Sequence, residues 1–101
     1  MRSVDAARGI VPDAWEAMHL DGITLIVSAF NTPSYGDATW RRSSAVRSTE
    51  VVAGKLHVTT ASGSTYILHK DRRMEEAPMD DVTAGLRYYG YTRYTGGRYA
   101  L

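Results

Sequence analysis

The spacing of apolar positions along the chain predicts mostly β-structure. Residues 23–30 are apolar on both alternations and rich in β-branched side chains, which predicts a strand covered on two faces. Residues 31–37 form a dense turn cluster, where we expect a loop. Residues 39–52 are polar with small and β-branched side chains, which predicts one long strand or two strands with a bulge. Residues 55–61 and 65–70 are two further strands.

Two pairings are open for the hairpin that joins these last strands. A two-residue turn would leave apolar side chains on both faces, whereas a three-residue loop ending at Gly63 places Leu56 and Val58 opposite Tyr66 and Leu68. Loops of this kind favour glycine in the third position, where the backbone is left-handed. Apolar pattern and turn chemistry agree, and we predict the three-residue loop.

Two segments have the features of short helices. Residues 12–20 begin with proline, and Trp15 and Met18 are spaced for one buried face, which predicts a short N-terminal helix. Asp80 is expected to cap a C-terminal helix over residues 81–89, and Gly90 is expected to end it. The predicted fold class is α+β, a small antiparallel β-meander of about four strands with these two helices.

The composition indicates one domain over residues 1–101, in which residues 91–101 form either a small hairpin or a flexible tail. The chain has no cysteine, which excludes disulfides, a thiolate nucleophile and a cysteine-based metal site. Its net charge of +1 is far from the basic balance of a dedicated duplex-binding domain. No apolar run is long enough to span a membrane and the N-terminus lacks a signal peptide, so we expect a cytoplasmic protein.

No motif for catalysis is evident. His57 and His69 would lie diagonally on one polar sheet face, but two imidazoles fall short of the three or four ligands that a zinc site requires. The acidic residues 75–76 and 80–81 lie in a polar connection, where we expect solvated carboxylates rather than a catalytic pair. Serine elbows and phosphate-binding glycine loops are absent. We therefore expect no enzyme activity, no metal and no cofactor.

The C-terminal part has a different character. It contains five of the seven tyrosines, and three arginines alternate with them without any acidic residue after position 81. Arg41, Arg42 and Arg47 form a second basic patch on the polar strand. The predicted partner-binding residues are Arg87, Tyr88, Tyr91, Arg93, Tyr94, Arg98, Tyr99, Arg41 and Arg42.

Three interpretations of this tyrosine- and arginine-rich segment are open. Tyrosine and arginine dominate the energetic centres of protein interfaces, because both bury large rigid area while keeping hydrogen bonds. Aromatic faces that stack on bases, with guanidinium groups for phosphates, also make a surface for single-stranded nucleic acid. The same alternation is typical of an amphipathic edge strand. We favour a non-enzymatic protein-binding module and keep single-stranded nucleic-acid binding as the alternative.

The run from Thr59 to Leu68, Thr-Thr-Ala-Ser-Gly-Ser-Thr-Tyr-Ile-Leu, resembles a hairpin of many small uncharacterised proteins from bacteria, phages and mobile elements. The likeness covers ten residues and implies a β-hairpin without catalytic residues. By analogy it implies an accessory protein, such as an anti-CRISPR-like inhibitor that blocks a surface of a host defence complex.

Overall fold

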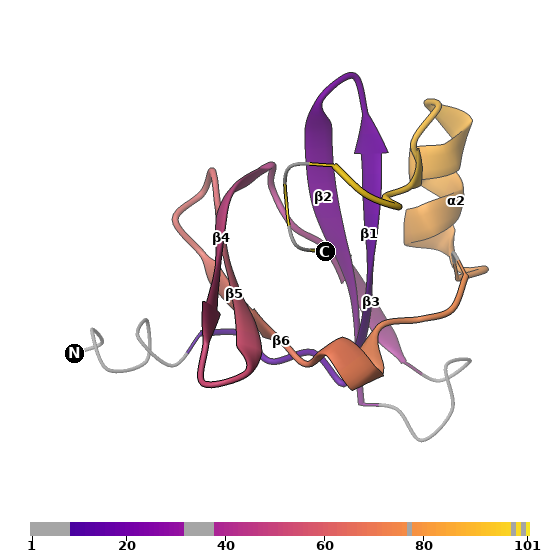
Figure 1. The fold of residues 1–101 in the computed structure, drawn as a ribbon. Helices are drawn as coiled ribbons and strands as arrows, with labels where there is room; N and C mark the ends of the chain where they lie inside the picture. Colours follow the sequence, from indigo (N-terminus) through magenta and orange to yellow (C-terminus); the bar gives the residue numbers. More distant parts are fainter. Residues whose placement is uncertain (1–8, 32–37, 77, 98, 100) are drawn as a thin grey trace.

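The computed structural model of the protein describes residues 9–31, 38–76, 78–97, 99 and 101 (Figure 1). The elements follow in the order β1 (Ala14–Leu20), β2 (Ile23–Phe30), β3 (Thr39–Arg42), β4 (Val46–Val52), β5 (Lys55–Thr60), β6 (Thr65–Leu68), the 3-10 turn η2 (Lys70–Arg72), α2 (Asp81–Tyr88) and β7 (Thr92–Arg93). None of the helices in these ranges has the length and apolar character that a membrane crossing requires.

Within the described residues, the strands form two antiparallel sheets. The first has the order β3-β2-β1-β7 and the second β4-β5-β6. Figure 1 shows the second sheet on one side of β1 and β2, and α2 on the other side. The α+β class is confirmed, but the single four-stranded meander is wrong, because the chain leaves the first sheet after β3 and enters the second with β4.

Ser43 explains why the chain changes sheets. Its N–H donates to the carbonyl oxygen of Ile26, and its Oγ accepts from the N–H of Ile26, both at 2.8 Å. Because the side chain takes the place of the next backbone carbonyl, the ladder between β2 and β3 stops here. Residues 39–52 are therefore two strands, and the bulge lies inside β4, where the register with β5 shifts between Val46 and Ser48.

The predicted N-terminal helix over residues 12–20 is wrong, because this segment is β1. All five residues from Ala14 to Met18 are buried, so the strand is covered on both faces and shows no alternation of polar and apolar positions. Asp21 and Gly22, with φ of 51° and 82°, make the turn to β2. An Asp-Gly pair between two apolar runs is a strong hairpin signal, and pairing with β2 along the whole of β1 outweighs the helical spacing.

The predicted strand over residues 23–30 and the predicted pairing of β5 with β6 are confirmed. Leu56 lies opposite Leu68 and Val58 lies opposite Tyr66. Gly63 ends the three-residue loop with a φ of 92°, which an L side chain rarely adopts. The local turn chemistry therefore determines which face of this hairpin enters the core.

The predicted C-terminal helix is also confirmed and ends one residue earlier than expected. The carboxylate of Asp80 accepts from the N–H of Thr83 at 3.0 Å and from its hydroxyl at 2.8 Å. At the other end Gly90 has a φ of 108°, and the N–H of Tyr91 donates to the carbonyl of Leu86 at 3.0 Å. Both ends of α2 are thus satisfied by residues at the expected positions.

The β1 and β2 strands of the first sheet are buried on both faces. One face packs on the second sheet in a cluster of Trp15, Ala17, Ile26, Val46, Leu56, Val58, Tyr66, Leu68 and Tyr94. The opposite face packs on α2 in a cluster of Met18, Leu25, Val27 and Leu86, with Trp40, Val82 and Tyr91 at its edge. The hairpin of β1 and β2 is therefore the central layer of the molecule.

Candidate functional site

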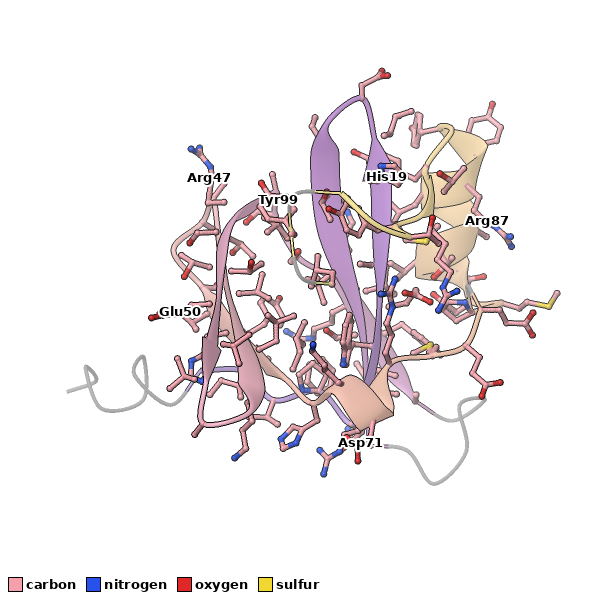
Figure 2. The ribbon with its side chains drawn as sticks, viewed as in Figure 1. His19, Arg47, Glu50, Asp71, Arg87 and Tyr99 are labelled. Atoms are coloured by element: carbon pink, nitrogen blue, oxygen red, sulfur yellow. The ribbon has the colours of Figure 1, made fainter. Side chains whose placement is uncertain are left out.

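The tyrosines near the C-terminus lie partly inside the protein. Tyr94 is only 4% exposed, and its N–H donates to the carbonyl of Ala17 at 2.8 Å. Tyr99 donates its N–H to the Tyr94 hydroxyl at 2.9 Å and its hydroxyl to the Val46 carbonyl at 3.2 Å. It lies between β4 and the first sheet (Figure 2). These two side chains close the space between the two sheets.

Arg93 is held in a buried ionic cluster. Its Nε lies 2.5 Å from Oε2 of Glu16, and the Nε of Arg73 lies 2.7 Å from Oε1. The N–H of Ala17 also donates to Oε1 at 2.8 Å. Glu16 is fully buried in the middle of β1, so its charge depends on these donors.

The same cluster fastens three segments together. Arg93 donates to the carbonyl of Met74 at 2.9 Å, and Arg73 donates to the carbonyl of Tyr94. The Arg73 guanidinium also lies 5.4 Å from the ring centroid of Trp15, within range of a cation–π contact. The cluster thereby joins β1, the connection before α2 and the segment around β7. We therefore expect it to stabilise the fold.

The structure separates the predicted partner-binding residues into three groups. Within the described part of the chain, four of them are exposed: Arg41, Arg42, Arg87 and Tyr88. Four are buried or half-buried in contacts within the protein: Tyr91, Arg93, Tyr94 and Tyr99. Arg98 lies outside the described residues. The surface available to a partner is therefore centred on α2 and β3 rather than on the tail.

Two large aromatic side chains stand in solvent at the end of α2. Tyr88 is 86% exposed and Tyr89 is 74% exposed, and their rings meet edge to face with centroids 5.5 Å apart. Arg87 precedes them on the outer side of the helix and points away from the sheets (Figure 2). Met79 is 99% exposed just before α2 begins. Contiguous exposed apolar groups are typical of contact surfaces.

An open groove of about 590 Å³ lies between α2 and the first sheet. It is lined by Leu20, Leu25, Arg42, Val82, Gly85, Leu86, Tyr89 and Tyr91. Arg42 is the charged member of this lining and is exposed to solvent. Its guanidinium makes a long 3.4 Å hydrogen bond to the Ser43 carbonyl and has no carboxylate partner among the described residues.

Arg41 and Arg42 do not form one patch, because neighbouring residues of a strand face opposite sides of the sheet. Arg42 lines the groove beside α2. Arg41 lies on the side of the second sheet, where its charge acts on Tyr66: burial raises the pKa of the Tyr66 hydroxyl, and Arg41 partly opposes this rise. The predicted basic patch is thus divided between the two faces of the first sheet.

The histidines of the described residues belong to no group that could hold a metal ion. His57 lies opposite Ile67 and beside Glu50 across the strands, and no group of three or more His, Asp and Glu in these ranges could hold a metal ion. Ser28 Oγ is buried without a hydrogen-bond partner in the same part of the chain. A serine without a base to receive its proton has no means of activation.

Sequence reasoning missed two features of this site. Glu16 is a single acid inside an apolar run, and such an acid signals a buried ion pair. The groove had no sequence signal except Gly85, an unfavourable residue for a helix interior.

No protein-family model matches the chain, and comparisons with curated proteins and with solved structures likewise give no match.

Proposed function

We propose that the protein is a non-enzymatic protein-binding module whose contact surface is the outer end of α2 with the adjoining groove. The observation that carries this proposal is the exposed pair Tyr88 and Tyr89, which stands beside an apolar groove and next to Arg87. Tyrosine and arginine contribute disproportionately to binding at the centres of protein interfaces.

The tertiary contacts favour the end of α2, rather than the C-terminal segment, as the contact surface. Tyr94 and Arg93 already make contacts that hold the sheets together, so a partner would have to break them before using these side chains. Tyr88 and Arg87 make no such contacts in the described residues, and binding them leaves the core intact.

The kind of partner follows from the resemblance of the hairpin over residues 59–68. Inhibitors of host defence from phages and mobile elements are often one small domain that blocks a surface of a larger complex, and the step to this protein is an analogy. We propose the same for this protein: its partner is a host defence complex, and it inhibits by occupying the surface that the complex uses.

The test is affinity capture from the native host with three versions of the protein. The unchanged protein is expected to retain a specific protein, and the double variant Arg87→Ala/Tyr88→Ala is expected to lose it. Arg47→Ala is the matched control, because Arg47 is an exposed arginine on β4 that points away from α2 (Figure 2). Equal capture by all three versions would overturn the proposed surface.

Nucleic acid is the competing outcome of the same test. The captured material is analysed for DNA and RNA, and fluorescence anisotropy with an oligo-dT probe is recorded at low and at high salt. Binding that weakens steeply with salt and disappears with Tyr88→Ala would replace the protein partner by a single strand.

A further inference from the structure

Gly85 occupies the middle of α2, where glycine is the least favourable residue after proline. A glycine persists in such a place when its backbone is left-handed or when a neighbour leaves no room for a side chain. Neither reason applies to Gly85. It lies in regular helix, and a Cβ added there would meet no atom within 4 Å.

Other glycines of the chain show the contrast. At Gly97 the φ is 135° and an added Cβ would lie 2.5 Å from the Tyr94 hydroxyl oxygen. At Gly9 the φ is 75° and the carbonyl oxygen of Thr65 would lie 2.9 Å away. These two glycines are required by the fold of the chain itself. Gly85 is left without an internal reason.

The space beside Gly85 is the groove described above. Gly85 is one of its lining residues, together with the apolar groups of Leu20, Leu25 and Tyr89. Its volume is in the range of sites that bind small ligands. The bare helix backbone at Gly85 therefore keeps an apolar hollow open to solvent.

The electrostatics of the groove indicate what enters it. Arg42 is the charged residue among the described groove-lining residues, and its guanidinium lacks a carboxylate partner there. An apolar hollow with an unpaired guanidinium group in its lining complements an apolar side chain with a carboxylate close by.

We infer that this groove receives one bulky apolar side chain, of the size of leucine or phenylalanine, from an acidic segment of the partner protein, and that Arg42 pairs with a carboxylate of that segment. The inference rests on the proposed function and specifies the chemistry of the partner at the same surface. The absence of a side chain at Gly85 would then allow the partner's side chain to contact the helix backbone.

The test begins with selection of a displayed library of random twelve-residue peptides on the immobilised protein. The selected peptides are expected to share a leucine- or phenylalanine-sized residue within a few positions of Asp or Glu. One selected peptide is synthesised and its affinity for the unchanged protein and for variants is measured by isothermal titration calorimetry.

Four variants separate filling of the groove from loss of folding. Gly85→Trp fills the groove and is expected to weaken peptide binding at least about tenfold, the loss typical of blocking a central contact. Gly85→Ala, which adds a single methyl group and favours the helix, is its control and should bind within about threefold of the unchanged protein. Arg42→Glu should weaken binding, and Arg47→Glu should not.

Three results would overturn the inference. They are a selection without an apolar and acidic consensus, unchanged affinity in Gly85→Trp, or equal effects of Arg42→Glu and Arg47→Glu.

The variant Gly85→Trp is also used in the capture experiment of the preceding section. If a captured protein is lost with Arg87→Ala/Tyr88→Ala but kept with Gly85→Trp, the proposed function is supported and the inference about the groove is wrong. Failure of the unchanged protein to capture any protein removes the proposed function itself.

Discussion

At the scale of single residues, Glu16 is the most constrained side chain of the molecule. It is an acid on β1, a strand that is buried on both faces, and three N–H donors surround its carboxylate. Desolvating a carboxylate is unfavourable unless its partners are well placed, so the position of each arginine matters. Arg73 and Arg93 reach Glu16 from segments that are far apart in sequence, and the core of the first sheet depends on their meeting.

The substitution Glu16→Ala is expected to lower the free energy of unfolding by about 3 kcal/mol, because it leaves two guanidinium groups without their acceptor. The measurement is the midpoint of urea unfolding followed by circular dichroism. Glu50→Ala is the control, since Glu50 is exposed on β4 and its loss should change stability by less than about 0.5 kcal/mol. Equal midpoints for the two variants would show that the cluster contributes nothing.

Tyr66 makes stability sensitive to alkaline pH. Burial raises the pKa of its hydroxyl above the ordinary value of 10.0, with Arg41 opposing part of the rise. The unfolded chain therefore releases this proton at lower pH than the folded protein does, so the contribution is complete below pH 10.0 and is lost as the pH rises through the folded pKa. Unfolding midpoints at about pH 9 and about pH 11 should fall less in Tyr66→Phe than in the unchanged protein. A parallel fall in both proteins would contradict this.

Among the secondary-structure elements, α2 is stabilised by the residues at its ends more than by its length. Eight residues are too few for a stable isolated helix, so capping and contact with the sheet have to hold it. Asp80 caps the first turn through both the N–H and the hydroxyl of Thr83, and Leu86 is the residue of the helix that enters the core beneath it. The proposed contact surface lies at the C-terminal end of the same helix and in the groove beside it, and its order depends on these attachments.

The variant Asp80→Ala is expected to lose about 1 kcal/mol of stability through the lost cap. The neighbourhood of Tyr88 and Tyr89 should then show faster amide exchange by hydrogen–deuterium exchange, because fraying begins in the helix that carries them. Asp71→Ala, at an exposed acid of η2, is the control and should leave exchange in α2 unchanged. Unaltered exchange in Asp80→Ala would mean that packing alone holds the helix.

At the scale of the whole molecule, the hairpin of β1 and β2 is enclosed by the second sheet on one face and by α2 on the other. The C-terminal segment completes the first of these contacts, with Tyr94 and Tyr99 between the sheets. The tyrosines of one short segment therefore divide by role. Tyr94 belongs to the core, whereas Tyr88 is free to meet a partner.

This division gives a prediction with a matched pair of tyrosines. Tyr94→Ala is expected to cost about 3–5 kcal/mol, as for other large aromatic side chains removed from a core. Tyr88→Ala should change stability by less than about 0.5 kcal/mol and should affect partner binding instead. Thermal unfolding of both variants by calorimetry measures the difference. Similar losses of stability in the two would contradict the assignment of Tyr94 to the core.

Features of this protein that depend on neighbouring residues could be predicted from the amino-acid sequence. Gly63 specified the loop and hence the pairing of β5 with β6, and Asp80 with Gly90 specified both ends of α2. These features follow from the dihedral angles and hydrogen bonds of a few consecutive residues, which a sequence displays directly.

The burial of β1 and the change of sheet after β3 depend on contacts between distant segments and could not be predicted from the sequence. β1 is buried on both faces and so lost the alternation that would have identified it as a strand, and Ser43 sends the chain to a second sheet by bonding to Ile26. The roles of Tyr94 and Tyr88, which look alike in the sequence, depend on whether the two sheets meet over them. Burial is a property of contacts between distant segments, and for that reason the surface available to a partner emerged from the fold.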